Sequence, residues 1–348
     1  MESIYVLEPG AYLHRQGQCL KVVKSGETIS EIPMEGLKRL ILIGYVSLTG
    51  GVLDFLITNR VETVFMTPTG RYRARLAIDE HRHVKLRMAQ YQKLSSPDFA
   101  LSTAKTIVEG KLKNMTKFLL LRARQYGDKK LRAAAAQLKG MCDAVREMDS
   151  IDKLRGLEGN ATRTYFQVFP YLIRNPFFEF RGRNKRPPLD PVNAMLSFAY
   201  TMLTNEVLSA VKAVGLDPYL GSLHAIDYGR PSLACDLVEE YRCFLGDRLV
   251  LGVINRKAVS PEDFVYRKGN PSNFVDEEEM KKKRPVEMKP YISRAFVATY
   301  EQMMNRAVAY GNKVKKTTYR LVILNQARAF ANYLQDAEQQ YNPFSWEI

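Results

Sequence analysis

The stretch LILIGYVSLTGGVLDFLITNRVETVFM, residues 40–66, decides the fold of the N-terminal part of the chain. It begins with the apolar run Leu40–Ile43, which predicts a strand. Apolar residues then recur every three or four positions, which predicts one amphipathic helix over 46–59. Val61–Met66 returns to a strand pattern. This strand–helix–strand unit predicts a small sheet domain that carries one helix.

Short segments broken by turn residues surround this unit and predict further strands. They are Ser3–Leu7, Tyr12–Arg15, Cys19–Val23, Thr28–Ile32 and Tyr72–Leu76. The stretch 79–98 has the composition of a boundary, and after it helical spacing replaces the strand pattern. We expect helices over 131–148, 161–173, 192–214, 233–245, 291–310 and 319–336. Between them, the basic segment 174–190 and the charge-dense segment 266–290 are expected to be loops, and 268–285 is expected to be poorly ordered in the free protein.

The charge balance is the first functional signal. The 348 residues hold 52 Lys and Arg against 37 Asp and Glu, a formal net charge of +15. Such a surplus indicates a polyanionic partner, namely nucleic acid, an anionic membrane surface or an acidic protein; the alternative is a merely solvated cationic surface. The four cysteines form no CxxC pair, the N-terminus has no signal-peptide pattern, and the longest uncharged run, 40–53, is too short to span a membrane. We therefore expect a soluble, cytoplasmic protein.

Candidate chemistry comes from three stretches, because no P-loop, HExxH or GxSxG motif is present. Glu158 precedes a predicted helix, where the helix dipole favours a carboxylate. His224 lies among glycines and a proline. Asp236 and Glu239 are three residues apart, so both carboxylates project from one helix face. Each also has a plain structural interpretation: a helix-start acid, a satisfied structural histidine, and acids on a solvated surface. Together they suit Mg²⁺ or Mn²⁺ better than zinc, since no cysteine cluster is available.

These stretches resemble the signature blocks of a known family, the CRISPR-associated integrase or "Cas one" adaptation family. The matching blocks are LEGNATRTYF at 157–166, DPVNAMLSFAYTML at 190–203, GLDPYLGSLH at 215–224 and GRPSLACDLVEEYR at 229–242. The resemblance covers nearly the whole chain. It implies an α+β fold of two domains: a small N-terminal β-sandwich-like dimerisation domain with one helix over 1–80, a linker over 81–98, and a larger all-α catalytic, metal-binding domain over 99–348.

The resemblance also implies the site residues. The catalytic metal ligands would be Glu158, His224 and Glu239, with Asp236 as a nearby fourth acid, and which of the two acids binds the ion stays open. The expected DNA-binding residues are Arg163, Asn193, Tyr200, Arg230 and Arg242.

The implied function is a Mg²⁺- or Mn²⁺-dependent DNA integrase and endonuclease of CRISPR adaptation. A 3′-OH of a prespacer would attack a phosphodiester at the leader–repeat junction of the array. The implied partners are DNA, a second copy of this chain, a Cas two dimer that bridges two integrase dimers, and a Cas four nuclease as an optional addition; no membrane is involved. Two alternatives stay open: a structure-specific repair-type DNA nuclease, and a catalytically silent DNA-binding scaffold of the adaptation complex.

Overall fold

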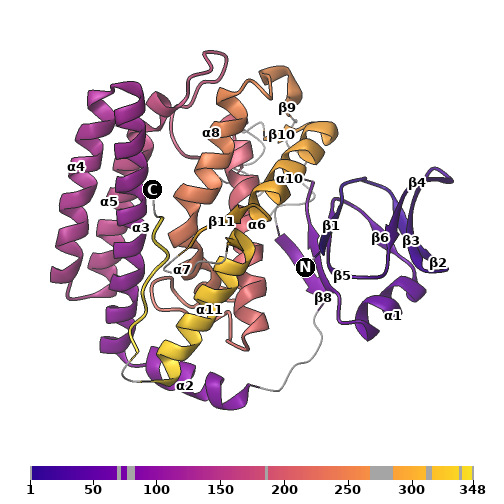
Figure 1. Cartoon of the computed structure of the whole chain (residues 1–348), viewed down its shortest axis with the longest axis horizontal. Helices are drawn as coiled ribbons and strands as arrows, with labels where there is room; N and C mark the ends of the chain where they lie inside the picture. Colours follow the sequence, from indigo (N-terminus) through magenta and orange to yellow (C-terminus); the bar gives the residue numbers. More distant parts are fainter. Residues whose placement is uncertain are drawn as a thin grey trace. The chain divides into compact units, whose positions relative to one another are not determined.

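The computed structural model (Figure 1) describes residues 2–68, 72–76, 83–184, 187–266, 285–310, 316–336 and 339–346. Residues 69–71, the start of the expected linker at 81–82 and all but the last residue of the stretch 268–285, which is expected to be poorly ordered, lie outside the described residues. The chain divides into two compact units. The first comprises Met1–Glu80, Lys185–Thr201 and Pro261–Thr299, and the second comprises His81–Asn184, Met202–Ser260 and Tyr300–Ile348. The first unit thus includes two segments from the sequence beyond residue 99.

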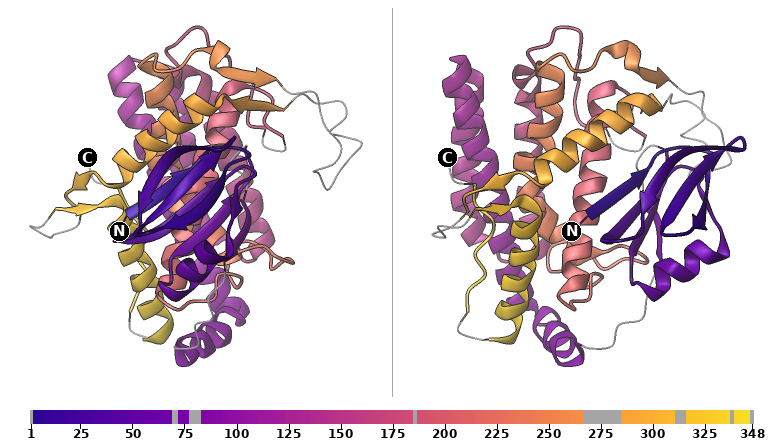
Figure 2. Two further views of the ribbon diagram at one scale, coloured as in Figure 1. Left: turned by 90° about the vertical axis from the view of Figure 1, so that its right-hand side faces the viewer. Right: turned by 45° about the vertical axis from the view of Figure 1, so that its right-hand side comes forward.

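The first unit contains two sheets, which Figure 2 shows in further views. The strand order of one is β1-β5-β7-β8, and that of the other is β4-β3-β2-β6. Their bounds are β1 Glu2–Val6, β2 Tyr12–Gln16, β3 Cys19–Lys24, β4 Glu27–Pro33, β5 Leu37–Ile43, β6 Ser47–Leu48, β7 Glu62–Met66 and β8 Tyr72–Leu76. The parallel pair β5–β7 is joined through helix α1, Gly50–Thr58. The predicted strands are confirmed.

One apolar core joins both sheets and α1, as in a β-sandwich. Its buried members include Leu13, Leu20, Leu40, Leu42, Val52 and Leu56. The helix predicted over 46–59 begins only at Gly50, because the two residues of β6 pair with β2. The unit also holds residues 191–201 of α6 (Pro191–Ala213), residues 290–299 of α10 (Pro290–Met304) and the hairpin of β9, Phe264–Tyr266, with β10, Val286–Met288.

The second unit is mainly helical. Besides the rest of α6 and α10 it contains α2 Val84–Leu94, α3 Pro97–Tyr126, α4 Lys129–Ala144, α5 Ile151–Val168, α7 Ser232–Tyr241, α8 Arg248–Asn255 and α11 Tyr319–Gln335. The long helix α3 packs against α4, α5 and α7. Gly127 ends α3 in the left-handed conformation at φ 67°, and the Asp128 carboxylate then caps α4 at the amides of Lys130 and Leu131.

The helical part differs from the prediction at several points. It is not all-α, because β11, Ala307–Val308, pairs with β12, Thr317–Thr318, and the β9–β10 hairpin also comes from beyond residue 99. The helix α2 occupies most of the expected linker and buries Leu86, Gln90 and Leu94 at helical spacing. The helix predicted over 233–245 is interrupted, because a π-helix, Arg242–Asp247, follows α7. None of the described helices combines the length and the apolar composition needed to cross a membrane.

Candidate functional site

Helix α5 carries Glu158 in its middle. The prediction that Glu158 precedes a helix is therefore wrong. The helix begins at Ile151, seven residues before Glu158, and the Ser150 hydroxyl at its start accepts from the Lys153 amide at 3.4 Å. Leu154 and Tyr165 are fully buried on the face that packs into the unit. Packing of this face outweighs the low helix propensity of the two glycines beside Glu158.

Asp236 on α7 holds the loop that carries His224. Its Oδ2 accepts from the backbone amides of Ser222 and Leu223 at 2.6 and 2.9 Å. Its Oδ1 accepts from the His224 amide at 2.9 Å and lies 2.7 Å from Nδ1 of the His224 ring. Asp236 is fully buried, so these donors compensate for the loss of hydration of its charge. Nδ1 is thereby occupied, and Nε2 remains as the ring atom that can bind a ligand.

The same loop is held at its other end by helix α2. The Gln90 side chain is fully buried; its amide donates to the carbonyls of Asp217 and Leu220 at 2.8 and 3.0 Å, and its oxygen accepts from the Asp217 amide at 2.8 Å. Gly221 lies where a Cβ atom would come 2.9 Å from the Leu233 amide and press on the Asp236 carboxylate. Only glycine fits there, so the loop before His224 can pack this closely against the start of α7.

Glu239, one turn after Asp236 on α7, belongs to a buried ion network. Its Oε1 accepts from Arg242 Nη1 at 2.5 Å, and its Oε2 lies 2.7 Å from Lys111 Nζ. Lys111 comes from α3 and also donates to Oε1 of Glu158. Burial by itself would raise the pKa of Glu239, but Arg242 and Lys111 outweigh it and lower that pKa to about 2. Burial would likewise lower the pKa of Lys111, and the two carboxylates reverse this and raise it.

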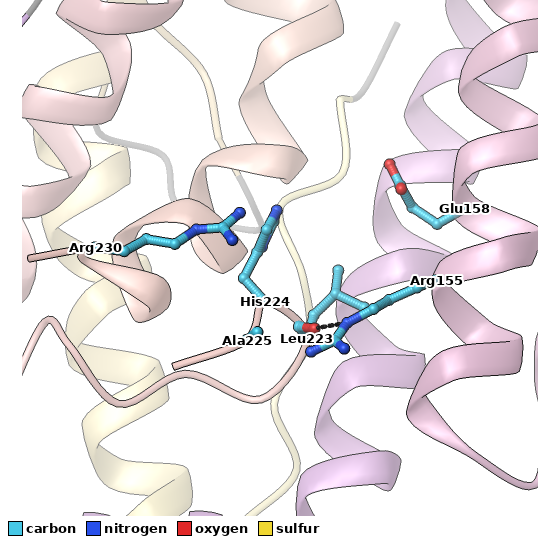
Figure 3. Close-up of a pocket in the computed structure, with 6 residues that line it drawn as sticks. All are labelled: Arg155, Glu158, Leu223, His224, Ala225 and Arg230. Carbon is cyan, nitrogen blue, oxygen red and sulfur yellow. Dashed lines mark hydrogen bonds between the residues drawn. The ribbon is translucent and has the colours of Figure 1, made fainter. Parts of the chain in front are cut away.

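Helix α5 and the loop that carries His224 line a pocket of about 320 Å³ in the second unit. Figure 3 shows Glu158 projecting from α5 on one side, and His224 with Arg230 on the other. Arg155, one turn before Glu158, donates from Nε to the Leu223 carbonyl at 2.6 Å and so ties α5 to the His224 loop. The pocket thus combines a carboxylate and an imidazole with two guanidinium groups, Arg155 and Arg230.

The remaining expected DNA-binding residues lie in different surroundings. Arg163 is exposed on α5, and Arg242 is engaged with Glu239. Asn193 and Tyr200 belong to the first unit. The Asn193 side chain is fully buried there and donates to the side chain of Asp190, the residue before α6, at 2.6 Å. This local hydrogen bond stabilises the start of α6. The structure therefore does not bring Asn193 to a surface.

Sequence reasoning missed Lys111, Arg155 and Gln90 as members of the site. Lys111 carries the clearest sequence signal, because it lies on the same face of α3 as the fully buried Ile107, Val108 and Leu112. A lysine at a core position of an amphipathic helix requires a buried acidic partner. Arg155 pairs with the nearby Asp152 side chain as well as with the Leu223 carbonyl, and Gln90 bonds to backbone groups of Asp217 and Leu220. No local sequence pattern indicates the contacts to Leu223, Asp217 and Leu220.

The donor set fits a divalent ion of the Mg²⁺ or Mn²⁺ type. Across the described ranges, no three or more His, Cys, Asp or Glu side chains converge closely enough to hold a metal ion as they stand. Yet Glu239 Oε2 is buried and has no hydrogen-bond partner of proper geometry among the described residues; its contact with Lys111 is ionic only. The ion would be bound by the carboxylate oxygens of Glu158 and Glu239 and by Nε2 of His224. Asp236 already accepts from four protein N–H groups.

Glu240 is a third buried acid of α7, and it does not line the pocket. It accepts from the Tyr341 hydroxyl at 2.6 Å and from the Phe344 amide at 2.8 Å, so it anchors the C-terminal segment. Burial raises the pKa of Glu240 to about 7, although both hydrogen bonds lower it. The folded protein thus binds this proton more tightly than the unfolded chain does.

We expect Glu240→Gln to remove a pH dependence of stability. In the wild type, this proton stabilises the fold fully below the ordinary glutamate pKa, and the stabilisation is lost as pH rises through about 7. Between pH 5 and pH 8, the wild type should lose on the order of 2 kcal/mol more stability than the neutral variant, at about 1.4 kcal/mol per pKa unit. A constant offset between the two is also expected, because the glutamine NH₂ group faces one of the two donors. Denaturant unfolding at pH 5 and pH 8 measures the difference, with the exposed Glu147→Gln as control. Parallel profiles of unfolding free energy against pH for the wild type and Glu240→Gln would contradict this prediction.

Comparison with solved structures first gives the fold. The chain has the fold of two solved structures: the "Cas6-RT-Cas1--Cas2 complex" (TM-score 0.82, 24% identity, 99% of this chain and 36% of that chain) and a "Casposase bound to integration product" (TM-score 0.82, 23% identity, 100% of this chain and 95% of that chain). It spans about a third of the length of the first.

The family follows from sequence. The model of the family "CRISPR associated protein Cas1" matches residues 4–284. The "CRISPR-associated endonuclease Cas1 1" of Moorella thermoacetica is 33% identical over 99% of this chain and 98% of its own length. The chain belongs to the Cas1 family, and the resemblance noted from its signature blocks is confirmed.

Proposed function

We propose that this chain is a divalent-metal-dependent DNA integrase and endonuclease, which inserts prespacer DNA into a CRISPR array. The observation that carries the proposal is the pocket that Glu158 and His224 line together with Arg155 and Arg230. Glu239 is linked to the same carboxylate through Lys111. An acidic donor set flanked by arginines, in a chain of net charge +15, suits phosphodiester chemistry.

The residues of the pocket divide the work. Glu158, His224 Nε2 and Glu239 would hold the Mg²⁺ or Mn²⁺ ion, and Asp236 keeps the imidazole in its tautomer and orientation. The bound ion supplies Lewis-acid stabilisation of the charge that develops on the scissile phosphate. Arg155 and Arg230 offer guanidinium donors to non-bridging phosphate oxygens. In the reaction the prespacer 3′ oxygen forms a bond to phosphorus, the target 3′ oxygen leaves, and the proton of the attacking hydroxyl is released.

The assembly is part of the proposal. We propose a homodimer of this chain, with a Cas2 dimer bridging two such dimers, and a Cas4 nuclease as an optional further partner. The "Cas6-RT-Cas1--Cas2 complex" among the solved structures of this fold supports the partnership with Cas2. The same pocket could also direct water at branched or nicked DNA, which is the repair-type nuclease alternative.

Product analysis tests the proposal. A labelled prespacer is mixed with a leader–repeat duplex, Cas2 and the wild-type protein, with Mn²⁺ or with EDTA. We expect a strand longer than the prespacer, formed only with Mn²⁺, and none when the prespacer carries a 3′-deoxy end. Shortened strands alone would indicate the nuclease. Intact DNA under all conditions, with binding retained, would indicate a silent scaffold.

A further inference from the structure

Lys111 is a charged residue at a core position. Its side chain is 6% exposed, and the neighbouring Ile107, Val108 and Leu112 on α3 are fully buried. A lysine ammonium is rarely held in such surroundings unless an acid compensates for its lost hydration. Here it has two acidic partners, Glu158 on α5 and Glu239 on α7. Lys111 is therefore the group that joins the three helices around the pocket.

The same contacts offset the repulsion between the carboxylates of Glu158 and Glu239. Two carboxylates that share one location repel each other unless a cation lies between them. In the structure, the Lys111 ammonium supplies that charge, and it does so at oxygens of the residues that would bind a divalent ion. A monovalent ammonium and a divalent ion at the same oxygens repel each other strongly in buried surroundings.

We propose that Lys111 is a built-in counter-ion, which holds Glu158 and Glu239 together in the ion-free protein and competes with the divalent ion for their oxygens. This inference rests on the metal site of the proposed function. It has two consequences. The ligands are held close to each other before any ion arrives, and the affinity for the ion is weaker than the same ligands would give without the lysine.

Metal-binding measurements on charge-removing variants test the inference. Mn²⁺ binding is followed by electron paramagnetic resonance of the free ion, for the wild type, Lys111→Gln and Lys111→Met. We expect both variants to bind Mn²⁺ at least about tenfold more tightly. Their ion-free melting temperatures should fall by several degrees, and Mn²⁺ should raise them by more than it raises that of the wild type. An unchanged or weaker Mn²⁺ affinity of Lys111→Gln overturns the inference.

Two controls separate charge from packing. Lys113→Gln lies on the same helix, but its side chain is 58% exposed and pairs with Glu109, so both readouts should stay at wild-type values. Lys111→Arg keeps the charge and should bind Mn²⁺ no more tightly than the wild type; tighter binding by this variant also overturns the inference.

Mn²⁺ binding by Glu158→Gln tests the proposed metal site independently of Lys111. If Mn²⁺ binds the wild type and Glu158→Gln equally well, the ion is held elsewhere and both the site and the inference fall. If Glu158→Gln weakens binding and Lys111→Gln leaves it unchanged, only the role of Lys111 falls.

Discussion

Glu158→Gln and His224→Ala are each expected to reduce strand transfer at least about a thousandfold, which corresponds to about 4 kcal/mol of transition-state stabilisation. Each change removes one donor atom from the pocket, and the other donors cannot replace it. The fold should survive both changes. Glutamine has the shape of Glu158 and Lys111 keeps its pair with Glu239, while Asp236 keeps three backbone amides after loss of the imidazole. Single-turnover rates of joined-strand formation, at saturating DNA, measure the effect.

A matched acidic control makes this test specific. Glu147 lies in the short turn between α4 and α5, and its side chain is exposed. Glu147→Gln removes the same charge from the same region and should leave the rate within about twofold of wild type, since surface substitutions remote from a site have small effects. DNA binding of Glu158→Gln should also stay near the wild-type level. Joined product formed by Glu158→Gln at the control rate would refute the assignment of the pocket.

The strands of the first unit could be predicted from sequence because they are short, apolar and bounded by turn residues. Leu40–Ile43 is buried over its whole length. Helix α5 could not be delimited in the same way. Gly156 and Gly159 lower its intrinsic propensity, and the packing of Leu154 and Tyr165 against other elements overrides that local preference.

The proposed metal ligands of the candidate site could be predicted from the sequence, but the contacts of their side chains could not. The distance between Glu158 and Lys111 in sequence is 47 residues, so no spacing rule connects them. Asp236 and Glu239 form one acidic pair in the sequence, yet the structure gives them different partners. Asp236 faces the loop of His224, whereas Glu239 faces Lys111 and Arg242. Helical spacing gives the face of a side chain, and only tertiary packing decides which donor it meets.

Asp236→Asn is expected to damage both the fold and the chemistry. Asparagine keeps one acceptor oxygen and puts an NH₂ group where the other oxygen accepts backbone amides, so at least two buried donors lose their partner. The free energy of unfolding of the ion-free protein should fall by about 3 kcal/mol. His224 should also lose its fixed orientation, and strand transfer should drop about 10- to 100-fold, as for other residues that orient a ligand. Asp227→Asn, an exposed change in the same loop, should do neither.

The ion-free stability of Asp236→Asn also decides which acid of α7 binds the ion. If Asp236 holds the loop, its replacement lowers stability in EDTA, before any ion is present. If Asp236 were instead a metal ligand, Asp236→Asn would remove one negative charge from a group of carboxylates that repel each other without the ion. The ion-free variant would then be at least as stable as the wild type. The four N–H groups around Asp236 favour the first outcome, because an oxygen that already accepts two of them has little capacity left for a cation. Glu239 Oε2 has that capacity, because it accepts no hydrogen bond of proper geometry from the described residues and its contact there is the ion pair with Lys111.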